Sequence, residues 1–141
     1  MMNKNVQEKM CPLCRGTLKR ETRIFTSNYK DKNYSYNQIG NWCDECGESF
    51  LSPDDLKSSK KARTDKKREI DHLLKAEEIK EFRKKLKLSQ KEASLLFGGG
   101  PMAFSKYERG EQSQSKSTDI LMKLLLDDLV SINDIKKIAL N

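Results

Sequence analysis

Residues 89–110 read SQKEASLLFGGGPMAFSKYERG, and this stretch decides the fold of the second half of the chain. Ser89 followed by Glu92 is the capping-box pattern that begins a helix. Three consecutive glycines end that helix, because the conformational entropy of glycine disfavours the helical state. Pro101 suits the first turn of a new helix, which we expect to run to about Arg109 and to stop at the following glycine. The stretch therefore predicts two short helices joined by a tight turn.

Helical patterns continue on both sides of this stretch. Before it, Ile79, Phe82 and Leu86 recur at the spacing of one helix face. After it, Ser117 and Ser131 are expected to cap a fourth and a fifth helix. A helix followed by a capped short helix, a glycine turn and another short helix is the order of a helix-turn-helix. The sequence predicts an all-α domain of five helices.

The first half of the chain has a different texture. Residues 22–26 (TRIFT) and 34–36 (YSY) alternate polar with apolar or aromatic side chains, which predicts short antiparallel strands. Asn28 and the run Asp31–Asn33 are expected to form the turn between the strands. From residue 57 the chain becomes rich in lysine and arginine, which we interpret as a basic linker that becomes helical. The fold class is therefore α+β, with residues 1–68 forming a small antiparallel β domain plus this linker, and residues 69–141 the helix-turn-helix domain.

The four cysteines form two Cys-x-x-Cys pairs, Cys11 with Cys14 and Cys43 with Cys46. Each pair can present two thiolates from one tight turn, and four thiolates at tetrahedral corners suit Zn²⁺. Such a closed site has no coordination position for water, so we expect one structural zinc ion per chain. Two disulfides, a redox pair and an iron–sulfur cluster remain as alternatives.

The chain has no apolar run near the roughly 20 residues that cross a bilayer, and Met1 to Met10 lacks the apolar stretch of a signal peptide. We therefore expect a cytoplasmic protein without membrane contact. In a reducing compartment, paired cysteines indicate metal ligands more readily than disulfides.

The net charge of +7 is concentrated in the middle of the chain. Residues 1–56 carry eight basic and eight acidic side chains, residues 57–75 carry eight and three, and residues 76–141 carry twelve and ten. A basic segment that leads into a domain is typical of nucleic-acid binders. The plainer interpretation is a solvated helix face.

In a helix-turn-helix the second short helix enters the major groove of double-stranded DNA. Lys106 could then donate to guanine and Met102 could contact a thymine methyl group, while residues at the start of the preceding helix face phosphate. A purely structural helical core is the alternative. The expected DNA-contacting residues are Gln90, Lys91, Met102, Ser105, Lys106 and Arg109.

Several motifs together resemble the MqsA (YgiT-type) antitoxins, and the resemblance covers most of the chain. These motifs are Cys-Pro-x-Cys at residue 11, GNWCDECGE at 40–48, LSQKEAS at 88–94 and FGGGPMAFSKYERG at 97–110. The helix-turn-helix alone is similar to the broad Xre/Cro class, whereas its combination with four N-terminal cysteines is much narrower.

The resemblance implies a type II antitoxin whose zinc domain contacts a cognate toxin and whose C-terminal domain dimerises and represses its own operon. It also implies that Arg83 of the first helix pairs with Glu108. Met102 and Lys106 stand where family members often carry Asn and Arg, so the operator sequence does not transfer. The basic linker is longer than expected and either touches DNA or stays solvated.

Other functions remain as alternatives. A stand-alone Xre-type regulator without a toxin is the nearest, and a zinc-ribbon RNA binder is disfavoured by the neutral charge of residues 1–56. An enzyme is disfavoured because no nucleophile-elbow, zinc-protease or P-loop motif is present and the single His72 lies in the linker. A homodimer is expected because paired half-sites need two recognition helices. The apolar residues offered for this interface are Leu121, Leu124, Leu125, Leu129 and Ile132.

Overall fold

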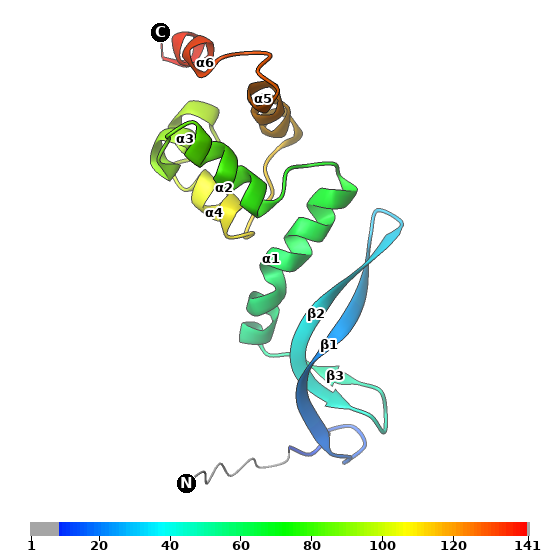
Figure 1. Ribbon diagram of the computed structural model, residues 1–141. Helices are drawn as coiled ribbons and strands as arrows, with labels where there is room; N and C mark the ends of the chain where they lie inside the picture. The colour runs from blue at the N-terminus through cyan, green and yellow to red at the C-terminus, as the bar shows by residue number, and fades with distance from the viewer. Residues whose placement is uncertain (1–8, 141) are drawn as a thin grey trace. The chain divides into compact units, whose positions relative to one another are not determined.

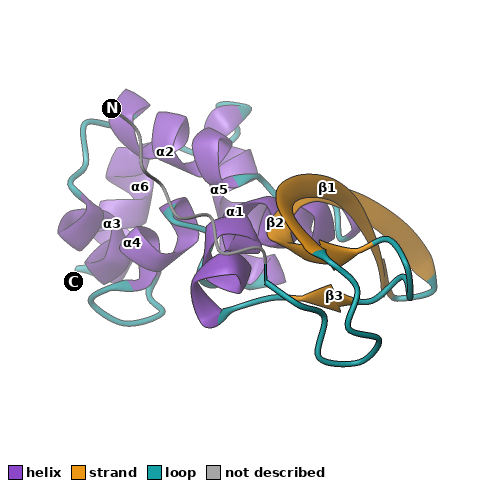
Figure 2. Cartoon of the chain, turned by 90° about the horizontal axis from the view of Figure 1, so that it is seen from below, coloured by secondary structure: helices purple, strands orange, loops and turns teal. Residues whose placement is uncertain are grey.

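The computed structural model describes residues 9–140, so the expectation about a leader at Met1 to Met10 falls mostly outside the described residues. The chain folds as two compact units, and the first ends at Ser59 and the second begins at Lys60. The first unit contains a three-stranded antiparallel sheet and the second contains helices only (Figure 1; Figure 2). The predicted α+β class is confirmed.

The sheet is dominated by one long hairpin. Strands β1 (Leu18–Tyr29) and β2 (Lys32–Cys43) pair along their whole length, and the short β3 (Ser49–Phe50) adds to the other edge of β2 (Figure 1). The strands are longer than predicted, and the turn is formed by Lys30 and Asp31, both with positive φ. Asn28 and Asn33 were also expected in the turn, but they pair with each other in the strands beside it. The side-chain amide of Asn28 donates to Asn33 over 3.1 Å.

One face of the hairpin is buried. In β2 every second residue from Tyr34 to Trp42 is buried, as period-2 alternation predicts. Phe25 of β1 packs its ring 5.8 Å from that of Tyr36 and 6.2 Å from that of Trp42. The fully buried Gln38 donates its side-chain amide to the carbonyl oxygen of Asp55. This bond ties the sheet to the first turns of the helix that follows.

Helix α1 (Pro53–Ile70) contains the predicted basic linker and begins before it. The helix begins at Pro53. Asp54 and Asp55 place acidic groups in its first turn, where they interact favourably with the positive end of the helix dipole. The division at Ser59 and Lys60 is earlier than the expected boundary after residue 68. The physical reason is that the second half of α1 packs Arg68 completely inside the second unit.

Five further helices follow, as predicted: α2 (Ala76–Lys85), α3 (Gln90–Phe97), α4 (Ala103–Glu108), α5 (Lys116–Leu126) and α6 (Ile132–Ala139). Ser89 caps α3 by accepting from the N–H of Glu92, and Ser131 caps α6. The expected cap at Ser117 is wrong. Ser115 caps α5 instead, because its hydroxyl oxygen accepts from the N–H of Thr118 and the preceding Gln114 is fixed in the interior.

The core of the second unit is formed by α2 to α5 around three aromatic contacts. Phe97 lies 5.7 Å from both Phe82 and Phe104, and Phe104 lies 5.4 Å from Tyr107, measured between ring centroids. The fully or nearly buried apolar residues are Leu74, Ile79, Phe82, Leu88, Ala93, Ala103, Phe104, Tyr107, Met122 and Leu125.

Residues 9–140 contain no helix long and apolar enough to cross a membrane.

Candidate metal centre and nucleic-acid interface

The two Cys-x-x-Cys segments fold into matching turns. In the first, the N–H of Arg15 donates to the carbonyl oxygen of Cys11, and the N–H of Cys11 donates to Gly16. In the second, Gly47 donates to Cys43 and Cys43 donates to Glu48 at the same offsets. Each turn aims two sulfur atoms at one point, because its backbone closes back on the first cysteine. The sheet brings the turns together, since Leu18 at the start of β1 pairs with Cys43 at the end of β2.

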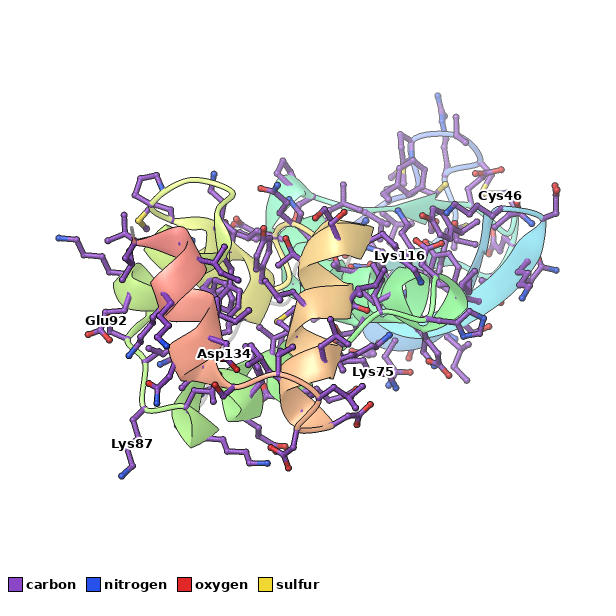
Figure 3. All side chains as sticks on the ribbon, turned by 90° about the horizontal axis from the view of Figure 1, so that it is seen from above. Cys46, Lys75, Lys87, Glu92, Lys116 and Asp134 are labelled. Carbon is purple, nitrogen blue, oxygen red and sulfur yellow. The ribbon has the colours of Figure 1, made fainter. Side chains whose placement is uncertain are left out.

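The four sulfur atoms form one cluster, and all lie within 4.8 Å of one another. Cys11 Sγ is 3.7 Å from Cys46 Sγ, and Cys14 Sγ is 3.4 Å from Cys43 Sγ. A tetrahedron with metal–sulfur bonds of about 2.3 Å has sulfur–sulfur edges of about 3.8 Å. The cluster therefore has the size of a four-thiolate metal site, and all four cysteines are free. Figure 3 labels one of them, Cys46.

The environments of the thiols differ. Burial raises the pKa of Cys11, but backbone N–H groups of Cys14 and Leu13 outweigh it and bring the pKa to about 7. At Cys14 the backbone N–H of Gly16 lowers the pKa, but the neighbouring thiols and burial raise it overall, to about 12. Four thiolates cannot crowd together without a cation. Metal binding at this cluster would therefore release protons.

Charged side chains brace the second cysteine turn against β1. Arg23 donates to Asp44 over 2.7 Å, and Lys19 lies 2.8 Å from the same carboxylate. The hydrogen bond from Arg23, followed by that from Lys19, lowers the pKa of Asp44 to about 2. Asp44 sits between Cys43 and Cys46, so these contacts fix the turn that carries two of the four sulfur atoms.

The turn between α3 and α4 depends on its three glycines. Gly98, Gly99 and Gly100 all have positive φ, a backbone conformation that residues with a Cβ atom rarely adopt. This extended turn delays the next helix, so α4 starts at Ala103 and not at Pro101 as predicted. Met102 becomes the residue before the helix, and the N–H of Ala103 donates to Gly100. The helix also ends at Glu108, one position before the predicted end.

The six expected DNA-contacting residues lie on or beside α3 and α4. Lys91, Met102 and Lys106 are exposed, and Ser105 is half-buried. Gln90 is exposed but its side-chain amide donates to Glu108 over 3.3 Å. Arg109 is exposed and its guanidinium lies 3.2 Å from Glu111. The structure brings these residues to the helix-turn-helix, with Gln90 and Arg109 already engaged in contacts inside the chain.

The predicted pairing of Arg83 with Glu108 is present. Arg83 Nη2 lies 2.8 Å from Glu108 Oε1 and Arg83 Nε lies 3.0 Å from Oε2, a two-pronged contact. Arg83 also donates to the carbonyl oxygen of Leu88 over 2.9 Å. The pair joins α2 to α4.

Sequence reasoning missed several buried polar residues. The hydroxyl of Ser94 donates to Gln90 and accepts from the N–H of Phe104, which links α3 to the start of α4. Arg68, Gln114 and Asp119 are also buried and share hydrogen bonds. The local sequence gives no periodic signal for such residues, because polar side chains of this kind usually lie at the surface. Only the tertiary contacts reveal them.

The apolar residues offered for a dimer interface do not behave alike. Leu125 belongs to the core, whereas Leu121, Leu124 and Ile132 are half-buried and Leu129 is 70% exposed.

Elsewhere in this unit, a hollow of about 320 Å³ lies between α3 and α6. Figure 3 shows Glu92, at its rim, pointing away from the helices. The hollow is lined by Leu88, Glu92, Leu95, Leu96, Lys136 and Leu140.

These features define a class of protein in which a cysteine-turn sheet precedes a helix-turn-helix unit. Residues 9–131 match the family described as the antitoxin component of a bacterial toxin–antitoxin system, MqsA. The antitoxin MqsA of Escherichia coli (strain K12) is similar, with 31% identity over 132 residues, which are 89% of this chain and 98% of that protein. The chain belongs to the MqsA antitoxin family. This family is one of antitoxins and not of enzymes.

Proposed function

We propose that the protein neutralises a cognate toxin through its N-terminal zinc domain and represses its own operon by sequence-specific binding of double-stranded DNA. Membership of an antitoxin family implies the toxin partner. The observation that carries the DNA-binding part is the exposure of Met102 and Lys106 at the start of α4 and on it. Buried polar contacts hold this short helix on its opposite, interior side. The alternative, a stand-alone regulator without a toxin partner, is less well supported, because the family that this chain belongs to consists of antitoxins.

The first part of the proposal is one structural Zn²⁺ per chain, held by Cys11, Cys14, Cys43 and Cys46. The support is the sulfur cluster, whose separations suit tetrahedral thiolate ligation. The ion would crosslink the two strands at the open end of the hairpin, where the third strand adds only Ser49 and Phe50. A reducing cytoplasm, where these thiols stay reduced, is the compartment in which both zinc and operator are available.

The second part is the DNA interface. We assign Met102, Ser105 and Lys106 to the major groove, and Gln90, Lys91 and Arg109 to the phosphate backbone. Lys91 stands at the start of α3, where the helix dipole favours an anion. Gln90 and Arg109 would exchange their contacts with Glu108 and Glu111 for phosphate oxygens.

The third part is a homodimer formed by the C-terminal domain, because two recognition helices are needed to read two half-sites. Exposed leucine and isoleucine side chains on α6 and on the residues on either side of it supply an apolar surface for a second copy. The exposed members of this surface are Leu129, Ile138 and Leu140. Sedimentation of the full chain at micromolar concentration tests the dimer, and a monomer would contradict it.

One experiment tests the function as a whole. The full chain is purified alone and after co-expression with the product of the adjacent gene, and each sample is titrated against a duplex from its own promoter and against a shuffled duplex. We expect co-purification of the adjacent product and preferential binding of the promoter duplex. A metal-loaded sample that binds neither the product nor the promoter duplex at low ionic strength would overturn the proposal.

A further inference from the structure

Arg68, near the end of α1, has no exposed side-chain area, although it carries a full charge. Burying a guanidinium is costly unless every donor finds a partner. Here Nε donates to Gln114 over 3.0 Å, Nη1 to Asp65 over 3.0 Å, and Nη2 to the carbonyl oxygens of Tyr107 and Gln112 over 3.0 and 2.9 Å. Three of these four acceptors lie at the carboxyl end of α4 or in the segment after it.

The same side of α1 makes a second contact with this segment. Thr64 donates its hydroxyl to the carbonyl oxygen of Gly110 over 2.7 Å. Gly110 has positive φ, and a Cβ atom there would lie 2.5 Å from the Cα atom of Lys61. The backbone after α4 therefore lies directly against α1. Arg68 places its positive charge where the dipole of α4 is negative.

The partners of Arg68 are themselves anchored. Asp65 also accepts the N–H of Ala76 at the start of α2, over 2.9 Å. Gln114 donates to the carbonyl oxygen of Leu74 and to Asp119, and Asp119 accepts the N–H of Leu74 over 2.8 Å. Hydrogen bonds of this buried network thus connect the start of α2, the end of α4 and the start of α5.

A helix as short as α4 (Ala103–Glu108) cannot keep its own orientation, so the surrounding contacts must supply it. Ser94 holds its first turn through the N–H of Phe104, and Arg83 holds Glu108 near its last turn. We propose that Arg68 is a positioning residue for DNA recognition, which fixes the carboxyl end of α4 so that Lys106 and Met102 meet the bases at the correct angle. This inference rests on the proposed DNA binding by α4.

The test compares the full-length protein with Arg68→Met, which keeps much of the side-chain length and removes all four hydrogen bonds. Binding is measured against the protein's own promoter duplex and a shuffled duplex, at a temperature where circular dichroism shows each variant folded. We expect affinity for the promoter duplex to fall about tenfold or more, and affinity for the shuffled duplex to change less than about threefold. The salt dependence of binding should stay unchanged, because Arg68 touches no phosphate.

Two controls separate positioning from loss of charge and from loss of stability. Lys75→Met removes the same charge from an exposed position beside Glu69, and should leave the ratio of the two affinities unchanged. Met122→Ala removes a fully buried apolar side chain of α5 that has no polar group to offer the network, and should also leave the ratio unchanged once the protein is folded. A milder variant, Thr64→Val, removes one hydrogen bond to the same segment and should lower the ratio about twofold to fivefold.

A folded Arg68→Met variant that binds the promoter duplex within about threefold of the unmodified protein would overturn the proposal. If Arg68→Met does not fold, Thr64→Val decides, and an unchanged ratio in that variant would overturn it. A reduced salt dependence would also overturn it, because Arg68 would then be a phosphate contact. Equal affinity of the unmodified protein for promoter and shuffled duplex is a different result, which contradicts the proposed function itself.

Discussion

Arg83 of α2 donates hydrogen bonds to both carboxylate oxygens of Glu108 in α4. Only 13% of the arginine side chain and 5% of the glutamate side chain are exposed. Few pairs in the described part of the chain join two helices in this way. Since Gln90 also donates to Glu108, the carboxylate connects all three helices of the helix-turn-helix. The orientation of α4 therefore depends on this pair.

Breaking the pair should destabilise the protein. Arg83→Met leaves the nearly buried Glu108 carboxylate without its main partner, and we expect a loss of about 3 kcal/mol in the free energy of unfolding. Chemical denaturation followed by far-ultraviolet circular dichroism measures this. Arg109→Met is a matched control, because its pair with Glu111 is exposed and should be worth less than about 1 kcal/mol. Equal losses in the two variants would mean that the Arg83 pair is a surface contact.

Removing the proposed zinc ion should unfold the sheet and spare the helices. Cys43→Ser, or a strong chelator, is expected to abolish binding of one zinc equivalent and to expose Trp42, the single tryptophan, which is buried beside Cys43. Tryptophan fluorescence reports the sheet, and circular dichroism reports the helices. Glu48→Gln changes an exposed side chain of the same turn and should bind zinc normally. One full zinc equivalent in the Cys43→Ser variant would contradict four-cysteine ligation.

Replacing Lys106 should weaken specific DNA binding. Lys106→Ala is expected to cost about 1–3 kcal/mol on the promoter duplex, because a donor to guanine is lost. Lys116→Ala, which removes an exposed lysine at the start of α5, keeps α4 intact and serves as a comparison for the loss of one charge. Fluorescence anisotropy with promoter and shuffled duplexes measures both variants. If Lys106→Ala lost equally on both duplexes, Lys106 would be a phosphate contact.

Acid should weaken the contact between the sheet and α1. The Arg20 guanidinium, followed by the N–H of Ser52, holds the pKa of Asp55 well below its ordinary value of 3.8. Because the folded-state pKa is lowered, this stabilisation is complete above pH 4 and is lost as the pH falls below it. We expect Asp55→Asn to destabilise the first unit at pH 7 and to lose its effect progressively below pH 4.

The measurement is urea unfolding followed by Trp42 fluorescence, with both proteins compared at each pH. Protonation of the cysteine ligands in acid affects the two proteins alike, so their difference isolates Asp55. A difference that stays constant from pH 7 to pH 3 would show that the carboxylate charge of Asp55 does not contribute.

Local patterns were sufficient for much of the fold. Period-2 alternation in the hairpin, the helix spacing of Ile79 and Phe82, and the cap at Ser89 each act within a few residues, so they can be interpreted from the sequence directly. The cysteine cluster was predictable for the same reason, because each Cys-x-x-Cys turn is local and four thiols in two such turns indicate one metal site.

Predictions failed at the ends of several elements. The cap of α5 moved from Ser117 to Ser115, and α4 began after Met102 because the glycine turn extends further than expected. The hairpin turn was expected at Asn28 and at Asp31–Asn33, and of these residues only Asp31 lies in it, because the register of two twelve-residue strands places the turn at Lys30 and Asp31.

The sequence by itself determined the order of the elements and the presence of two cysteine turns, because helix caps, strand alternation and Cys-x-x-Cys turns are set by residues near one another in the chain. The tertiary structure alone decided that Arg68 and Asp119 are interior residues and that the end of α1 belongs with the helices. The physical reason is that a charged side chain can be buried only where partners from distant segments satisfy its hydrogen bonds, and those partners meet only after folding.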